Sequence, residues 1–328
     1  MNREVLLELK DLHTFFKVKS GILKAVNGID LTIYKGESIG LVGESGCGKS
    51  TLGKTIMRLY KPQKGQVLYK GKDIWDFNKK ELLQYRKDIQ MIFQDPYASF
   101  DPLTIIGDTI AEGMDIHRMH QGKERSNKIL ELLKLIGLGR EHMNRFPHEF
   151  SGGQRQRVGI ARALALEPQL IVCDEPISAL DVSIQAQIVN LLNKLQKEVG
   201  VSYLFITHDL SMVKQISDRI AVMYLGSLVE ISPSEEIYEK NYHPYTKALL
   251  SAIPIPDPII EKKRKRIILN GDIPSPVNLK EECAFVSRCP YATEECRCKR
   301  PELKEISPDH FVSCFNADKI EALENQSF

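Results

Sequence analysis

The sequence lacks long apolar runs and has almost no net charge. Its 328 residues include 45 Lys and Arg against 43 Asp and Glu, which gives a formal net charge of +2. No stretch approaches the roughly 18 consecutive apolar residues of a membrane-spanning helix, and a balanced charge provides no global positive field for nucleic acid. Charged residues are spread over positions 3–11, where a signal peptide would be apolar. We therefore expect a cytosolic protein, long enough for a large core and two domains.

Cysteine is scarce until the last part of the chain. Of the seven cysteines, Cys47 and Cys173 stand alone, and the other five lie at or after Cys283. Because the cytosol keeps thiols reduced, such a cluster favours a metal site over disulfides.

A glycine-rich segment, Gly43–Ser50, links the apolar run 39–42 to a helix-like run over 51–59. Glycines allow successive backbone N–H groups to approach phosphate oxygens, and the following helix N-terminus adds partial positive charge. Lys49 can reach the outer phosphates, and the Ser50 hydroxyl can ligate Mg²⁺. This order predicts a nucleoside triphosphate site. The predicted nucleotide-contacting residues are Gly43, Ser45, Gly46, Cys47, Gly48, Lys49, Ser50 and Thr51.

An acidic pair, Asp174 and Glu175, ends the apolar run 170–173. An apolar strand that closes with two carboxylates, downstream of a phosphate loop, fits the Walker B arrangement. Asp174 would hold Mg²⁺ together with Ser50, and Glu175 can accept a proton from the attacking water.

Two further polar residues follow runs that are typical of buried strands. Gln94 follows 89–93, and His208 follows 203–207, the last strand that we predict for the core. In open α/β sheets, ligands bind at the carboxyl ends of the strands. Gln94 could therefore contact the ligand, although this signal alone is weak. His208 could reach the γ-phosphate, although a histidine after a strand is usually a surface or packing residue.

Outside these motifs, the sequence pattern predicts strands in some segments and helices in others. Strands are expected over 4–10, 25–33 and 65–69, whereas residues 104–150 are mostly helical in pattern. Phe15 and Phe16 lie upstream of the glycine-rich turn. Either ring could stack on an adenine, or both could pack in a strand core.

Together these motifs resemble the ATP-binding subunit of ABC transporters over about residues 5–250. The likeness rests on the phosphate loop 43–50, Gln94, the signature sequence Phe150–Gln154, Asp174–Glu175, Ser178–Asp181 and His208. A narrower likeness, to the dipeptide/oligopeptide importer ATPases, rests on segments 94–99, 178–185, 243–250, 271–276 and 288–292. The signature departs from the family pattern at Phe150, where leucine is commoner.

The resemblance implies an α/β fold. It consists of a P-loop NTPase (RecA-like) core with an N-terminal antiparallel β-subdomain, an inserted α-helical subdomain and a small irregular Cys-rich C-terminal extension. The ABC ATPase domain would span 1–255, with the helical subdomain at about 97–165, and the extension would span 256–328.

The resemblance also implies that two ATP-binding subunits pair head to tail and share ATP and Mg²⁺. Ser151, Gly153 and Gln154 of one subunit, with Asp181, would contact the ATP held by the phosphate loop of the other. Phe16, rather than Phe15, takes the adenine-stacking position.

The implied activity is ATP hydrolysis coupled to import of dipeptides or oligopeptides, at the cytoplasmic face of the cell membrane. By the same resemblance, Gln94 and His208 would act in catalysis with Glu175, and Gln94 would also contact Mg²⁺. Gln94 would sense the γ-phosphate and pass the change to a membrane partner. The implied partners are a second ATP-binding subunit, identical or paralogous, two transmembrane permease subunits and, indirectly, an extracytoplasmic peptide-binding protein, but no nucleic acid.

Four C-terminal cysteines match the pattern of this importer subfamily, with Cys298 additional: Cys283, Cys289, Cys296 and Cys314. Their spacing is too wide for a Cys-x2-Cys zinc ribbon. Four thiolates from a loop-rich tail are compatible with a [4Fe–4S] cluster, as the subfamily implies. A four-thiolate Zn²⁺ site and free thiols are the alternatives.

Two other functions are open at this point. One is a soluble ABC ATPase in nucleic-acid maintenance or translation, although such proteins usually carry two ATPase halves or a coiled-coil insertion. The other is a cluster-containing redox or regulatory protein, in which the cysteine tail is primary and hydrolysis secondary.

Overall fold

The computed structural model describes residues 3–95, 99–178, 180–254, 257, 266–269 and 271–320. The chain divides into two units, each built from segments that are distant in sequence. The first unit contains residues 1–6, 33–38 and 69–206, and the second contains 7–32, 39–68 and 207–328. The predicted domain boundary at 255/256 and the family-like residues 96–98 and Ala179 lie outside the described residues.

Three parallel strands form the centre of the first unit: β6 (Ile89–Ile92), β7 (Leu170–Asp174) and β8 (Ser202–Thr207), in the order β8-β7-β6. Leu170 pairs with Ile89 on one side and with Ser202 on the other, so the carboxyl ends of the strands meet at one edge. Every position of β7 and β8 is buried. Continuous apolar runs of this kind are typical of parallel strands that are covered on both faces.

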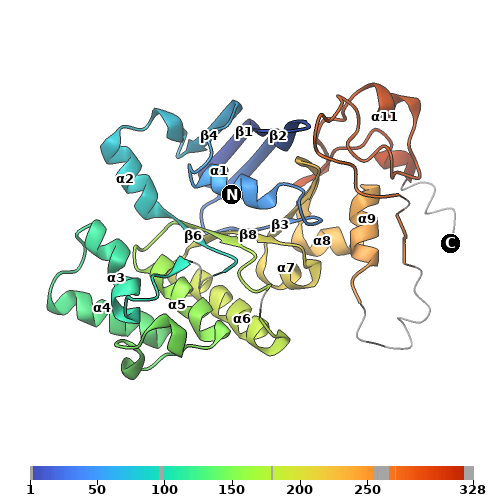
Figure 1. The fold of residues 1–328 in the computed structure, drawn as a ribbon. Helices are drawn as coiled ribbons and strands as arrows, with labels where there is room; N and C mark the ends of the chain where they lie inside the picture. Colours follow the sequence, from blue (N-terminus) through green and yellow to red (C-terminus); the bar gives the residue numbers. More distant parts are fainter. Residues whose placement is uncertain are drawn as a thin grey trace. The chain divides into compact units, whose positions relative to one another are not determined.

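Helices and short turns make up the rest of the first unit. The helices are α2 (Lys79–Asp88), α3 (Ile106–Ile116), α4 (Lys123–Leu135), α5 (Gly152–Leu164) and α6 (Val182–Val199). A two-residue strand, β5, and 3₁₀ turns lie at Lys72–Asp73, Ile74–Asp76, Arg140–His142 and Pro147–Glu149. Helices α3, α4 and α5 pack against one another (Figure 1). The region 104–150 that was predicted to be mostly helical therefore contains α3 and α4, which pack with the next helix, α5, before the strand β7.

The second unit contains a run of five neighbouring strands in the order β11-β12-β10-β9-β3. They are β3 (Ser38–Val42), β9 (Arg219–Tyr224), β10 (Ser227–Pro233), β11 (Lys304–Ser307) and β12 (His310–Val312). β3 and β9 are parallel, whereas β9, β10, β12 and β11 pair in antiparallel fashion. The prediction that 203–207 is the last core strand is wrong, because β9 and β10 follow it. The tail that was predicted to be irregular also contributes the hairpin β11–β12.

The remaining strands of the second unit are β1 (Val5–Val18), β2 (Gly21–Tyr34) and β4 (Lys64–Tyr69), in the order β2-β1-β4. Its helices among the described residues are α1 (Lys49–Ile56), α7 (Leu210–Ile216), α8 (Ser234–Glu239), α9 (Pro244–Ser251) and α11 (Glu294–Cys298). β1 continues well beyond the predicted end at residue 10. Asp11 has a φ of 42°, and such a residue shifts the inward and outward alternation of a strand. The interrupted alternation explains why the strand was predicted too short.

Candidate functional site

The glycine-rich loop connects β3 to α1 in the second unit, which is the strand, turn and helix order that its sequence predicts. Gly43 and Gly48 have φ angles of 157° and 108°. A Cβ on Gly43 would overlap the carbonyl oxygen of Met223, and one on Gly48 would overlap that of Ala25. Both positions therefore require glycine for steric as well as conformational reasons.

Lys49 is buried at the first turn of α1, with 4% of its surface exposed. Its Nζ donates to the carbonyl oxygens of Gly43 and Glu44 at 2.7 and 2.9 Å, and lies 3.8 Å from the Sγ of Cys47. A buried ammonium needs acceptors, and the oxygens of a triphosphate are acceptors of the right charge. The helix starts at Gly48 without a side-chain cap, so its first amides suit an anion.

Cys47 is the loop residue whose side chain is least suited to contact a ligand. It is buried, and burial raises the pKa of its thiol above the ordinary value. Its carbonyl oxygen accepts the N–H of Gly226 at 2.9 Å, in the turn between β9 and β10. Its backbone N–H donates to the carbonyl oxygen of Glu44 at 3.3 Å, and its thiol stays protonated and buried.

Gln94 and Glu175 meet at the carboxyl edge of the parallel strands in the first unit. The Nε2 of Gln94 donates to the Oε2 of Glu175 at 2.9 Å. Asp174 is the last residue of β7, where it is buried and pairs with Ile206 of β8. The structure thus brings Gln94 to the acidic pair, although the two were predicted from separate sequence motifs.

Glu175 adopts a left-handed backbone conformation, with a φ of 46°. Its N–H donates to the carbonyl oxygen of Ile206 at 2.9 Å, which fixes the chain as it leaves β7. Side chains other than glycine rarely adopt this conformation, which costs of the order of 1–3 kcal/mol and is concentrated at functional sites.

The signature sequence begins α5 in the first unit. Ser151 caps the helix: its Oγ accepts the N–H of Gln154 at 3.3 Å, while the Oε1 of Gln154 accepts the N–H of Ser151 at 3.0 Å. Ser151 is exposed, whereas Gly153 is buried against the side chain of Ile184. The exposed start of α5 therefore presents a hydroxyl and a helix N-terminus to a neighbouring anion.

Asp181 caps α6 in the first unit. Its Oδ1 accepts the N–H of Ile184 at 3.0 Å and the hydroxyl of Ser183 at 2.8 Å. The hydrogen bond from the Ile184 N–H holds the pKa of this carboxyl below its ordinary value. The exposed side chain is therefore charged at neutral pH.

Phe16 and His208 lie in the second unit with the phosphate loop. Phe16 belongs to β1, and its ring meets that of Tyr60 edge-on at 5.2 Å between centroids. Phe15 and Phe16 are both only half-buried, so neither is a core residue of the strand. His208 directly follows β8, before the Asp209 cap of α7.

The four family-matched cysteines lie in the tail around α11. Burial raises the pKa of the thiols of Cys283, Cys289 and Cys314 to about 11, and neighbouring cysteines add to the rise. Cys296 is buried, while Cys298 at the end of α11 is exposed. Within the described residues, no three His, Cys, Asp or Glu side chains are placed to share one metal ion.

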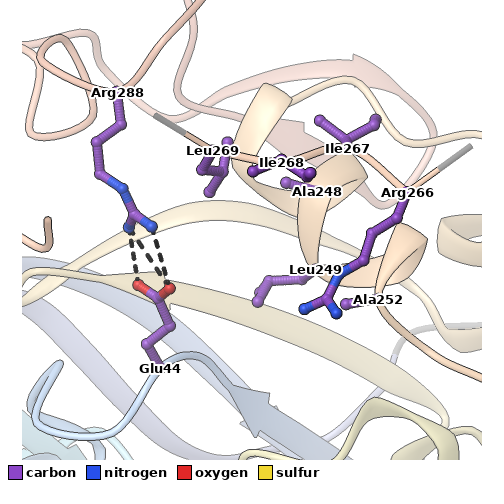
Figure 2. Close-up of a pocket in the computed structure, with 9 residues that line it drawn as sticks. All are labelled: Glu44, Ala248, Leu249, Ala252, Arg266, Ile267, Ile268, Leu269 and Arg288. Carbon is purple, nitrogen blue, oxygen red and sulfur yellow. Dashed lines mark hydrogen bonds and ion pairs between the residues drawn. The ribbon is translucent and has the colours of Figure 1, made fainter. Parts of the chain in front are cut away.

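One contact of the phosphate loop was missed by sequence reasoning. Arg288 forms an ion pair with Glu44, with Nη1 and Oε2 3.1 Å apart (Figure 2). The two residues are 244 positions apart, and no local pattern marks them as partners. Only the resemblance of segment 288–292 to the importer family drew attention to that part of the chain.

Comparisons with known proteins agree with these features. The family model for ABC transporters matches residues 26–178, and that for the oligopeptide/dipeptide transporter C-terminal region matches 229–296. The solved structure of MJ0796, a bacterial ABC transporter cassette in dimeric form, superimposes with a TM-score of 0.64 at 33% identity. It covers 70% of this chain and 99% of that one. The chain is therefore an ABC ATPase, and the predicted α/β fold of a P-loop NTPase is confirmed.

The likeness to one branch of this class extends over nearly the full length. The putative oligopeptide transport ATP-binding protein YkfD of Bacillus subtilis is 55% identical over 316 residues, covering 96% of each chain. The oligopeptide transport ATP-binding protein OppF of Salmonella typhimurium is 51% identical over 328 residues, covering 97% of this chain and 98% of that one. The chain belongs to the family of oligopeptide transport ATP-binding proteins, which confirms the resemblance drawn from the motifs. Among its described helices, none is long and apolar enough to cross a membrane.

Proposed function

We propose that this chain hydrolyses ATP to power the import of oligopeptides or dipeptides through a membrane ABC transporter, bound peripherally at the cytoplasmic face. The observation that carries the proposal is the contact between the Gln94 amide and the Glu175 carboxylate at the edge of the parallel strands. It links the residue expected to sense the γ-phosphate to the residue expected to accept the proton of the attacking water. The peptide substrate follows from the names of the full-length relatives.

In this proposal the phosphate loop binds the nucleotide, and the polar residues that follow the strands act on its γ-phosphate and Mg²⁺. The phosphate loop binds the triphosphate through backbone N–H groups, and the Lys49 ammonium neutralises its outer oxygens. Glu175 orients the water and takes its proton, and His208 contacts the γ-phosphate. Ser50 and Asp174, with Gln94, would hold Mg²⁺, which when bound neutralises the charge on the phosphates.

The proposal also requires a second ATP-binding subunit. Ser151, Gly153 and Gln154 open α5, and Asp181 caps α6, so their polar groups cluster at helix starts. Because Ser151 is exposed, it is available to the triphosphate that a partner chain holds. The two permease subunits, the peptide-binding protein and the Phe16–adenine contact are part of the same proposal, as is the division into 1–255 and 256–328.

We further propose that Cys283, Cys289, Cys296 and Cys314 hold a [4Fe–4S] cluster. The donor set fits such a group, because Asn316 donates its backbone N–H to the Sγ of Cys314 at 3.4 Å and its Nδ2 to the Sγ of Cys296 at 3.8 Å. N–H···S bonds of this kind tune iron–sulfur clusters. In a cluster each thiolate binds its own iron, so the four sulfurs need not converge on one ion. A single Zn²⁺ is the competing occupant.

The transport proposal is tested by purifying the chain from membranes with its associated proteins. Permease subunits should co-purify, and peptide with its binding protein should raise the ATPase rate of the reconstituted complex. Recovery of nucleic acid in place of permease subunits would contradict the proposal and revive the soluble alternative, which the relatives do not favour. Anaerobic purification with metal analysis tests the cluster: about four irons per chain are expected, and stoichiometric Zn²⁺ would refute it.

A further inference from the structure

Glu44 is the residue of the phosphate loop that other parts of the second unit hold most closely. Its carbonyl oxygen accepts a hydrogen bond from the Nζ of Lys49 at 2.9 Å. Its N–H donates to the hydroxyl of Tyr245 in α9, also at 2.9 Å. Its carboxylate faces the guanidinium of Arg288 (Figure 2). One loop residue is thus connected to the triphosphate-binding lysine, to α9 and to the cysteine-bearing tail.

Arg288 holds this carboxylate with both terminal nitrogens. Nη1 lies 3.1 and 3.4 Å from the two oxygens of Glu44, and Nη2 lies 3.5 Å from one of them. The side chain of Arg288 is 8% exposed and that of Glu44 is 25% exposed. Because a guanidinium is planar and rigid, such a pair fixes the orientation of the carboxylate as well as its distance.

An aromatic cluster supports the guanidinium from the side of the sheet. Arg288 lies over the ring of Tyr224 of β9, 6.0 Å from its centroid. Tyr224 packs against Tyr245 at 4.6 Å and against Phe285 of the tail at 5.3 Å between centroids. The groups that contact Glu44 therefore rest on one set of buried rings, which leaves them little freedom to move.

The Glu44–Arg288 pair borders a cavity of about 420 Å³, whose other lining residues include Leu249 of α9 (Figure 2). Packing on that side therefore does not by itself hold Glu44 in place. The ion pair and the Tyr245 hydrogen bond have to do so.

We propose that Arg288 is a positioning residue for the phosphate loop. Through Glu44 it holds the loop backbone, including the carbonyl oxygen that the Lys49 ammonium contacts, in the arrangement that accepts a triphosphate. A loop that is held in its binding arrangement loses less freedom when the nucleotide binds, so Arg288 raises nucleotide affinity. The inference rests on the proposed binding of ATP by this loop.

The test is Arg288→Met in the full-length, metal-loaded protein, with nucleotide affinity measured by fluorescence titration with a labelled ATP. We expect Kd to rise about 10-fold, which is about 1.4 kcal/mol of coupling. The rate at saturating ATP should stay within about 2-fold, because Glu175 and Gln94 keep their own contact. Arg297→Met is the matched control, because Arg297 is exposed on α11 of the same tail. The affinity of this variant for the labelled ATP should equal that of the wild type.

A second variant separates the ion pair from a general disturbance of the tail. Glu44→Gln leaves the tail sequence intact and should also raise Kd. In the Arg288→Met background it should improve binding, because it removes a carboxylate left without its partner. Arg288→Lys keeps the positive charge but loses the planar guanidinium with its two terminal nitrogens. Its Kd should lie between those of the wild type and Arg288→Met. Metal content of every variant is measured and should equal that of the wild type.

Three results would overturn the inference: an unchanged Kd in Arg288→Met, a normal Kd in Glu44→Gln, or strictly additive losses in the double variant. Failure of the wild-type chain to bind any nucleotide is a different outcome, since it refutes the proposed function itself. Loss of affinity that always accompanies loss of metal, with Glu44→Gln unaffected, would assign the effect to the cysteine site instead.

Discussion

Replacing Glu175 by glutamine tests the proposed chemistry with the smallest change of shape. The Oε1 of a glutamine can still accept the hydrogen bond that Gln94 donates to Glu175 at 2.9 Å. The left-handed backbone at this position and its N–H bond to Ile206 involve no side-chain atom. The substitution therefore removes only the charge and the ability to accept a proton.

The expected loss follows from that single missing step. A positioned general base contributes about 10²- to 10⁴-fold, so the hydrolysis rate should fall by that factor, or about 3–5 kcal/mol in activation free energy. Affinity for ATP should stay within about 2-fold, because the phosphate loop lies elsewhere in the chain. Without hydrolysis, an ATP-bound dimer should accumulate.

Single-turnover phosphate release, equilibrium ATP binding and size-exclusion chromatography with ATP measure these three quantities. Glu198→Gln, an exposed glutamate on α6 of the same unit, is the matched control and should hydrolyse ATP normally. A Glu175→Gln rate within about 10-fold of wild type would refute the general-base role.

Three further changes probe other parts of the site. Gly48→Ala should abolish nucleotide binding and lower the free energy of unfolding by more than about 2 kcal/mol, since the new Cβ would overlap the carbonyl oxygen of Ala25. In Gly46→Ala the new Cβ would meet no atom within 4 Å, so this variant should lose only about 1 kcal/mol. Burial lowers the pKa of His243 from 6.5 to about 4, and its Nδ1 accepts the Tyr245 N–H. As the pH falls from 6.5 to 4, the unfolded state therefore binds a proton at His243 that the folded state does not bind. Denaturant titration should show the free energy of unfolding falling by roughly 3 kcal/mol over this range. The His243→Asn variant should not show this fall. Cys289→Ser should lose the bound metal on elemental analysis, and full iron retention would exclude it as a ligand.

The parts of the fold that sequence reasoning predicted are those with local causes. The phosphate loop requires a strand, glycines and a helix start in immediate succession. Its geometry can therefore be predicted from the adjacent residues Gly43–Ser50. The acidic end of β7 is equally local, because an apolar run before two carboxylates places them at the edge of the sheet.

The parts that were missed depend on pairing between distant segments. β9 and β10 carry no motif. The pairing of β9 with β3, and of β10 with β9, follows from long-range packing rather than from their own pattern. The helix predicted over 51–59 ends instead at Ile56, because Arg58 adopts a left-handed φ of 60°. Arginine rarely adopts this conformation, so the sequence does not predict the helix end there. The pairing of Arg288 with Glu44 has no local cause at all.

The position of the tail follows from a buried carboxylate on β10. Glu230 and His310 of β12 both have fully buried side chains, and their Oε1 and Nε2 atoms lie 2.8 Å apart. The same carboxylate accepts the N–H groups of Tyr242 and His243 at the start of α9. A buried carboxylate is stable only while such partners remain, and removing β12 would take away the His310 partner of Glu230, leaving it with the two N–H groups alone. The cysteine-bearing tail is thus built into the sheet that supports the phosphate loop, and Arg288 extends that connection to the loop itself.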